Sequence, residues 1–224
     1  MSPRSKVLRP AAPVPAAPSR AKMLPVLDLL VVGAGPTALA VGADALRAGL
    51  SVLLVERGAL TDAILHFPTY MTFFTTRELL EIAGVPFAIP EDKPDRRQAL
   101  AYYRAVAALH RVPLALHEEV LSARRRRGVF EVETRTAAGA SRRRARNLVL
   151  ATGYFGDPRK LGIPGESLPW VSSRYGEAHP HFGERVLVVG GGNSAVETAL
   201  DLWRGGARVT LVHRGAAVKP TVKY

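Results

Sequence analysis

The chain has 224 residues, 47% of them apolar and 22% charged, which fits one or two globular domains and excludes a disordered chain, a collagen-like fibre or a coiled coil. It contains no cysteine, so disulfide scaffolds, thiolate metal sites and cysteine nucleophiles are excluded. The formal net charge is +12, but no RNA-binding signature accompanies the runs Arg124–Arg127 and Arg142–Arg146, so we expect them at solvated strand ends and predict no nucleic-acid partner.

The chain begins with a stretch rich in Pro and Ala over residues 1–24. We expect a flexible tail, or sequence upstream of a true start at Met23. This stretch lacks the apolar core of a secretory signal. The following apolar stretch, Leu24–Leu46, is interrupted by Asp28 and Pro36, which argues against a spanning helix. The sequence therefore predicts no membrane partner and a cytoplasmic location.

The most informative feature is an internal repeat. Residues 28–58 align without a gap on residues 185–215, at a constant offset of 157. Each copy predicts an apolar strand, a glycine turn, a helix, a glycine stop and a second apolar strand. Near-continuous Val and Leu in both strands indicates burial on both faces, as in a parallel sheet. We therefore predict an α/β fold with two Rossmann-like dinucleotide-binding βαβ modules, the second of them incomplete.

Between the two copies, the pattern predicts one helix and a small group of strands. Apolar side chains recur at helical spacing over residues 98–110, and residues 112–121 have a strand-like pattern. Residues 129–135 alternate as a half-exposed strand does, and a turn then leads back into the apolar residues 147–153. These features predict a β-meander or hairpin insertion.

The first glycine turn, from Gly33 to Ala38, has the GxGxxA form of a dinucleotide-binding fingerprint. Gly33 permits the tight turn, Gly35 lets a pyrophosphate approach the backbone, and the small Ala38 lets the helix pack close to the strand. Glu56 lies 23 residues after Gly33, at the end of the next strand, where a carboxylate accepts both ribose hydroxyls of an adenosine. We interpret this turn as a nucleotide site rather than a glycine turn without a ligand.

The second glycine turn, Gly190 to Ala195, has the same setting but a different ribose position. The residue equivalent to Glu56 is His213, followed by Arg214. A cationic pair there removes the repulsion of a ribose 2′-phosphate and supplies donors to it, which favours NADPH over NADH. The alternative is that both are ordinary strand-end residues.

One acidic and one basic ribose position indicate two different dinucleotides, FAD at the first turn and NADPH at the second. Residues 147–153, followed by 163–166, form a sequence pattern that connects the two domains in flavoprotein reductases and monooxygenases. We predict an FAD-binding domain over residues 25–160 and a partial NAD(P)H-binding domain over residues 161–224. The histidines have no paired carboxylate at ligand spacing, so the sequence predicts no metal site.

Several segments together resemble the YpdA-type flavoproteins, the bacillithiol disulfide reductase family of the thioredoxin-reductase-like FAD/NAD(P)-binding superfamily. The segments are residues 67–87, 98–107, 150–158, 176–182 and 188–200. The resemblance runs from about Met23 to Tyr224, and its most specific part is the MTFF segment that begins at Met71. It implies an FAD-containing, NADPH-oxidising enzyme of redox homeostasis.

The resemblance also implies which residues contact each cofactor. On the FAD side they are Gly33, Gly35, Pro36, Thr37, Ala38, Glu56, Arg57, Met71, Thr72, Phe73, Val120, Thr152 and Gly153. On the NADPH side they are Gly190, Gly192, Asn193, Ser194, Ala195, His213 and Arg214. No catalytic side chain is assigned.

The sequence departs from this family in two respects. Members proposed to act on bacillithiol disulfide carry a cysteine where this chain has Thr37, and a hydroxyl cannot form a mixed disulfide. Family chains also continue beyond the point that corresponds to Tyr224, so we expect a C-terminally truncated chain that lacks a flavin-contacting segment.

The leading hypothesis is an NADPH-dependent FAD oxidoreductase that reduces a low-molecular-weight disulfide, such as bacillithiol disulfide, or another electron acceptor. A homo-oligomer is one arrangement that the chain could adopt. A flavin monooxygenase shares the two glycine motifs, and residues 175–179 loosely match its pattern. A nucleotide-binding remnant without turnover is the third interpretation.

Overall fold

The computed structural model describes residues 25–156 and 158–216. The predicted flexible tail over residues 1–24, with its alternative start at Met23, lies outside the described residues. Within the described ranges, no helix is both long enough and apolar enough to cross a membrane.

The first module contains a six-stranded sheet in the order β3-β2-β1-β6-β5-β4. Its strands are β1 (Val26–Val32), β2 (Val52–Val55), β3 (Leu114–Ala115), β4 (Glu119–Arg126), β5 (Val129–Thr136) and β6 (Gly139–Leu150). β1 pairs in parallel with β2 and with β6, whereas β4, β5 and β6 pair antiparallel. Helix α1 (Pro36–Arg47) connects β1 to β2. The predicted first βαβ unit and its meander are therefore confirmed.

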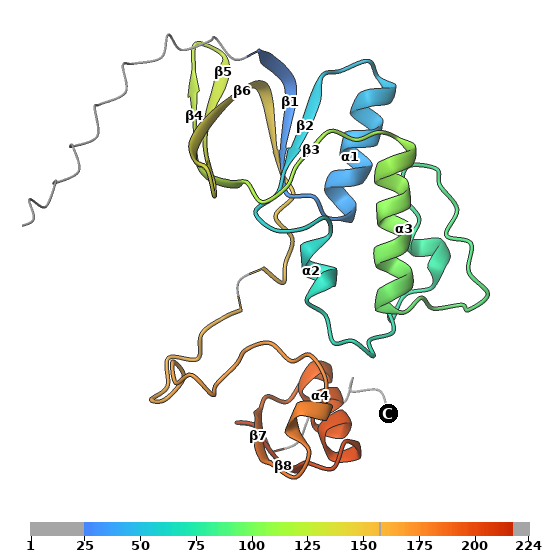
Figure 1. Cartoon of the computed structure of the whole chain (residues 1–224), viewed down its shortest axis with the longest axis vertical. Helices are drawn as coiled ribbons and strands as arrows, with labels where there is room; N and C mark the ends of the chain where they lie inside the picture. Colours follow the sequence, from blue (N-terminus) through green and yellow to red (C-terminus); the bar gives the residue numbers. More distant parts are fainter. Residues whose placement is uncertain (1–24, 157, 217–224) are drawn as a thin grey trace, which may run out of the picture.

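Two apolar clusters lie on opposite faces of this sheet. Figure 1 shows α1 and α3 (Arg96–Leu109) covering one face, while the β4–β5–β6 meander curls over the other. Val31 of β1 packs with residues of both helices, among them the fully buried Tyr103. Leu30, whose side chain points to the other face, packs with Val132 and Ala145 of the meander. Because side chains point alternately to the two faces along β1, this strand contributes to both apolar clusters, as its near-continuous apolar pattern predicts.

Helix α3, predicted over residues 98–110, begins two residues earlier, at Arg96, after the N-cap residue Asp95. The Asp95 side chain accepts a hydrogen bond from the Gln98 backbone N–H at 2.7 Å, and the Gln98 side chain accepts one from the Asp95 N–H at 2.8 Å. This reciprocal capping box satisfies two backbone donors that have no partner inside the helix. The short elements α2 (Asp62–Leu65) and η1 (Arg77–Leu80), which precede α3, are too brief to show a periodic pattern and were not predicted.

The second module repeats the βαβ arrangement. After the short η2 (His179–His181), strand β7 (Arg185–Val189) leads through α4 (Asn193–Arg204) to β8 (Arg208–Val212). β7 and β8 pair in parallel, with Val186 opposite Val209. The second βαβ unit predicted from the repeat is confirmed.

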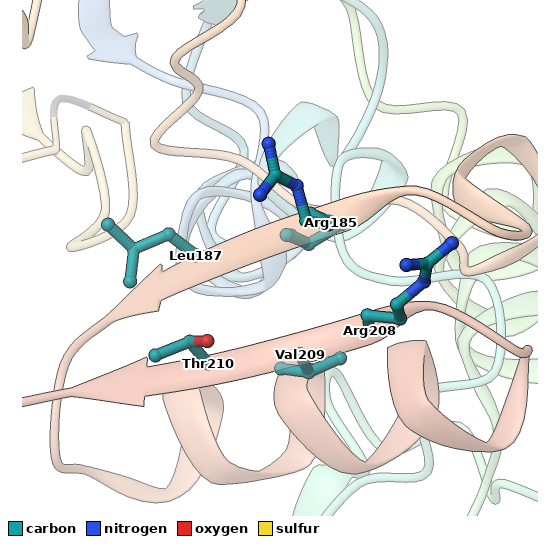
Figure 2. Close-up of a pocket in the computed structure, with 6 residues that line it drawn as sticks. Arg185, Leu187, Arg208, Val209 and Thr210 are labelled. Carbon is teal, nitrogen blue, oxygen red and sulfur yellow. The ribbon is translucent and has the colours of Figure 1, made fainter.

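Burial of this second sheet differs from the prediction. α4 covers one face, but Leu187 and Val189 are 61% and 52% exposed on the other. Figure 2 shows that open face, where Arg185 and Arg208 lie together at the start of the two strands, beside an open hollow of about 520 Å³. The apolar pattern predicted burial on both faces, and this was wrong for the described residues because no second layer packs on this side.

The strand-like segment over residues 112–121 is divided by a turn. The chain forms the two-residue β3, turns at His117, and starts β4 at Glu119. His117 adopts a left-handed conformation with φ of 55°, which no extended strand contains. The turn lets His117 and Glu118 donate backbone hydrogen bonds to the carbonyls of Gly58 and Glu56, at 3.1 and 2.9 Å.

The first arginine run lies at a strand end, as predicted, because Arg124–Arg126 are the last residues of β4 and Arg127 follows it. The second run, Arg142–Arg146, lies inside β6, so the prediction was wrong there. Arg124 lies opposite Glu131 of β5, which also pairs with Arg144 of β6, and Glu133 lies opposite Arg142. The outer face of an antiparallel meander is solvated, so it accepts charged side chains at every second position. Alternating glutamates on β5 between two arginine-bearing strands offset the repulsion.

Candidate functional site

The first glycine loop lies between the end of β1 and the start of α1. Gly33 has φ of +113°, and a Cβ there would lie 2.3 Å from the backbone oxygen of Ala151, just beyond β6. Only glycine therefore allows β1 and the chain after β6 to approach this closely. Gly35, in contrast, would place a Cβ in open space, with nothing within 4 Å. The loop therefore has no room for a side chain at Gly33 but leaves free space at Gly35.

The start of α1 leaves backbone donors for a ligand. Gly35 is the N-cap residue, no side chain caps the helix, and Pro36 occupies the first turn. The first N–H groups of a helix have no partner inside it and carry the positive end of the helix dipole. Thr37 is exposed on this turn, while Ala38 is fully buried against the sheet. This arrangement suits a phosphate that approaches at Gly35.

Glu56, at the end of β2, reaches back to the glycine loop. Its Oε2 accepts a hydrogen bond from the Ala34 N–H at 3.0 Å, and its Oε1 accepts one from the Gly58 N–H at 2.9 Å. Each carboxylate oxygen has a second lone pair. Glu56 is therefore held by the backbone while it keeps acceptor capacity for the hydroxyls of a ribose.

A cleft of about 410 Å³ opens where the ends of β1, β2 and β6 meet. Its size lies in the range of small-molecule and cofactor pockets. Among its lining residues are six of those predicted for FAD: Gly33, Glu56, Arg57, Val120, Thr152 and Gly153. Parallel pairing places the ends of these strands at one edge, where ligands bind in open α/β sheets.

The cleft also contains residues that the sequence analysis missed. Glu118 ends the turn before β4 and Glu119 is the first residue of that strand, while Tyr154 and Gly156 follow the predicted Thr152 and Gly153. The only sequence signal for Tyr154 and Gly156 is that they continue the segment in which Thr152 and Gly153 stand. No local pattern distinguishes Glu118 from other carboxylates, because its place depends on the unpredicted turn.

The predicted contacts Met71, Thr72 and Phe73 do not line this cleft. They follow α2, and the Phe73 N–H donates to the Pro94 carbonyl at 2.9 Å. The Phe73 ring lies 6.1 Å from Phe67, whose ring makes an edge contact at 5.5 Å with Phe155, next to Tyr154 of the cleft. Aromatic packing thus connects this segment to the cleft, and its contact with FAD stays a prediction.

The second glycine loop resembles the first in its backbone. Gly192 is the N-cap of α4 without a side-chain cap, and a Cβ there would meet nothing within 4 Å. Asn193, Ser194 and Ala195 form the first turn of α4, so the predicted residues of this loop lie together. A Cβ on Gly190 would lie 2.8 Å from the Ala195 Cβ, which requires a small residue at each position.

The ring of His213 lies directly against this second loop. A Cβ on Gly191 would lie 2.8 Å from His213 Nδ1, and that nitrogen accepts a hydrogen bond from the Gly215 N–H at 3.0 Å. In the neutral ring the proton is then on Nε2, which is buried and has no hydrogen-bond partner within the described part of the chain. Arg214 is exposed beside it. A buried donor without a partner and an adjacent guanidinium suit an anionic ligand.

A tyrosine pair connects the two modules. The Tyr175 hydroxyl donates a hydrogen bond to Asp201 of α4, and the Tyr175 ring lies 6.4 Å from that of Tyr70. Burial, with the charge of Asp201 nearby, raises the pKa of Tyr70 to about 12. The backbone of Thr69 also donates to the Gly176 carbonyl at 3.0 Å.

Comparisons with known proteins identify the family. Residues 30–224 match the family described as pyridine nucleotide-disulphide oxidoreductase. The chain is 36% identical over 195 residues to bacilliredoxin reductase Bdr of Bacillus subtilis, a match that covers 87% of this chain and 59% of the relative. The resemblance inferred from the sequence is confirmed, and the chain spans about 59% of the length of this relative.

Two solved structures have the same fold. Bacillithiol disulfide reductase Bdr (YpdA) from Bacillus cereus superposes with a TM-score of 0.86 and 38% identity, covering 89% of this chain and 62% of that one. The enzyme of the same name from Staphylococcus aureus superposes with a TM-score of 0.84 and 37% identity, over 88% of this chain and 60% of that one.

Proposed function

The chain belongs to the pyridine nucleotide-disulphide oxidoreductase family, and from this premise we propose an NADPH-dependent, FAD-containing oxidoreductase that reduces a low-molecular-weight disulfide such as bacillithiol disulfide. The single observation that carries the proposal is the cleft beside Gly33, because residues predicted for FAD from separate segments line it. FAD, when bound, supplies a two-electron carrier between nicotinamide and disulfide.

The first module would hold the adenosine and pyrophosphate part of FAD. Glu56 orients the ribose by accepting its hydroxyls, while the free N–H groups at the start of α1 donate to the phosphates. The open space at Gly35 supports this assignment, because any side chain would project into it.

The second module would select the nicotinamide nucleotide. His213 lies against the second glycine loop with a buried Nε2, and Arg214, which follows it, is exposed. The position equivalent to Glu56 is therefore occupied by a histidine and not by a carboxylate. A 2′-phosphate would therefore find donors where the first module offers an acceptor. This contrast supports NADPH rather than NADH.

The disulfide must be reduced without a thiol of this chain. The sequence contains no cysteine, and Thr37, on the exposed first turn of α1, offers only a hydroxyl. A hydroxyl donates or accepts a hydrogen bond but does not exchange with a disulfide. The proposal therefore assigns no thiol–disulfide exchange to these 224 residues.

The test uses the purified full chain incubated with FAD and passed through gel filtration. We expect a yellow protein whose flavin is bleached by NADPH without oxygen and restored by bacillithiol disulfide. Glu56→Gln is expected to lose flavin, whereas the exposed Glu78→Gln, a matched carboxylate outside the cleft, retains it. A colourless wild-type protein refutes the proposal, and NADPH oxidation that depends on oxygen and ignores the disulfide favours a flavin monooxygenase.

A further inference from the structure

One carboxylate in the cleft is buried and bound to a guanidinium behind it. Glu118 lines the cleft, and its side chain is only 3% exposed. Arg143, from β6, donates to it through both ends of the fork, Nε to Oε1 at 3.0 Å and Nη2 to Oε2 at 2.7 Å. This two-bond geometry is the strongest form of the Arg–carboxylate pair. It holds the pKa of Glu118 below its usual value.

The pair is joined directly to the residue proposed to hold the ribose. The Glu118 N–H donates to the Glu56 carbonyl at 2.9 Å, and the Glu56 N–H donates to the Ala115 carbonyl at 2.9 Å. The turn between β3 and β4 thus holds the backbone of Glu56 on both sides. Because Arg143 anchors Glu118 to the meander, it also anchors this turn.

The charges around the cleft show a second consequence of the pair. Glu56, Glu118 and Glu119 all line the cleft. Arg143 pairs with Glu118, and Arg135 pairs with Glu119 through an Nη2 to Oε2 distance of 2.6 Å. Of the three, only Glu56 has no basic side-chain partner in the described structure, and its two oxygens accept hydrogen bonds from the backbone instead.

Glu56 would be compensated by the ribose hydroxyls that it accepts, but a further unpaired carboxylate in the cleft would repel an anionic dinucleotide. Coulomb interactions over a few ångströms are strong where the protein excludes water, and a buried charge is expensive unless it is paired. FAD carries a pyrophosphate, so neutralisation of the buried Glu118 would favour its binding in the cleft, whereas Glu119 is 43% exposed and screened by water.

We propose that Arg143 is a positioning residue for dinucleotide binding, which acts by cancelling the charge of Glu118 on the turn that holds Glu56. This inference rests on the proposed FAD site and adds to it a residue outside the cleft lining. Arg143 belongs to a run of arginines whose neighbours lie on the solvated outer face of the meander.

The test measures the dissociation constant of FAD for the full chain by flavin fluorescence, at about 0.05 M and about 1 M NaCl. Arg143→Gln is expected to weaken binding about tenfold or more at low salt, and less at high salt, where the Debye length is about 3 Å. Arg143→Lys restores most of the affinity because it restores the charge. Arg142→Gln is the matched control, since the Arg142 side chain is 78% exposed and lies 3.9 Å from Glu133.

The double variant Glu118→Gln/Arg143→Gln separates charge from packing. It removes both charges, with glutamine equal in size to glutamate and smaller than arginine, so affinity for FAD is expected to return to within about threefold of the wild type. Folding is checked by circular dichroism. The inference about Arg143 is overturned if Arg143→Gln binds FAD like the wild type. It is also overturned if the double variant folds and binds FAD as weakly as Arg143→Gln at both salt concentrations. In either case the proposed function still stands. If the wild type binds no FAD, the proposed function fails with it.

Discussion

Replacing Gly33 by alanine tests the close approach on which the first glycine loop depends. The new Cβ would lie 2.3 Å from the Ala151 oxygen and 3.0 Å from the Ala151 carbonyl carbon. Neither atom belongs to a flexible side chain. The Ala151 N–H also donates to the Val32 carbonyl at 2.8 Å, so the segment after β6 cannot move away without loss of that bond.

The cost follows from these contacts. A non-glycine residue at φ of +113° stores about 1–3 kcal/mol of backbone strain, and one disrupted backbone hydrogen bond adds about 1 kcal/mol. We expect Gly33→Ala to lower the free energy of unfolding by about 3 kcal/mol. For a chain of this size, that lowers the melting temperature by about 6–12 °C.

Gly35→Ala is the matched control, because the same methyl group enters open space two residues away. Gly35 has φ of −78°, which alanine adopts without strain, so the stability of the protein without cofactor is expected to change by less than about 1 kcal/mol. FAD affinity is nevertheless expected to fall about tenfold or more, since the methyl group occupies the space through which the pyrophosphate approaches the backbone.

Thermal unfolding of both variants without FAD, followed by FAD titration of each folded protein, distinguishes the two effects. FAD is omitted from the first measurement because a bound ligand would stabilise the native state by itself. A melting temperature for Gly33→Ala within about 2 °C of the wild type would refute the steric argument. Unchanged FAD affinity for Gly35→Ala would show that the loop does not contact the cofactor.

Three further predictions concern other parts of the molecule. Arg214→Ala is expected to weaken NADPH binding about tenfold with little effect on NADH, and equal use of both nucleotides by the wild type would contradict it. Amides of β7 and β8 are expected to exchange hydrogen faster than those of β1 and β2, since one face of their sheet is exposed, and equal protection by hydrogen-exchange mass spectrometry would contradict it. The pKa of Glu118 is lowered in the folded state by Arg143, so its ionised form stabilises the protein above pH 4.5 and this contribution is lost as the pH falls through the lowered pKa. In urea unfolding, Glu118→Gln is therefore expected to be about 2 kcal/mol less stable than the wild type at pH 7, and a difference that persists in acid would contradict the ion-pair explanation.

The local signals of the chain were sufficient for the two βαβ units and for the main helices. Glycine at positions 33 and 190, and the apolar runs on either side of each loop, need no distant partner to be recognised. The capping residues Asp95 and Gln98 similarly mark the start of α3 within four residues. Each of these signals acts through contacts between neighbours in sequence.

The cleft required the tertiary structure, because its walls come from strands that are far apart in the chain. Val32 lies opposite Leu150 only because β6 returns to pair with β1 after the whole meander. Glu118 and Arg143 meet because β4 and β6 are both paired with β5, and neither residue differs locally from other charged residues of the chain.

The sequence by itself determined the fold class and the family, since glycine loops, helix starts and apolar periodicity are local properties and the repeat shows them twice. Only the tertiary structure decided which residues share the cleft, which arginines are paired, and that Leu187 and Val189 stay exposed despite an apolar pattern. The physical reason is that burial and charge pairing depend on what packs against a residue. Strand pairing brings together segments that are far apart in the chain, and the local sequence of one segment does not show which other segment will pair with it.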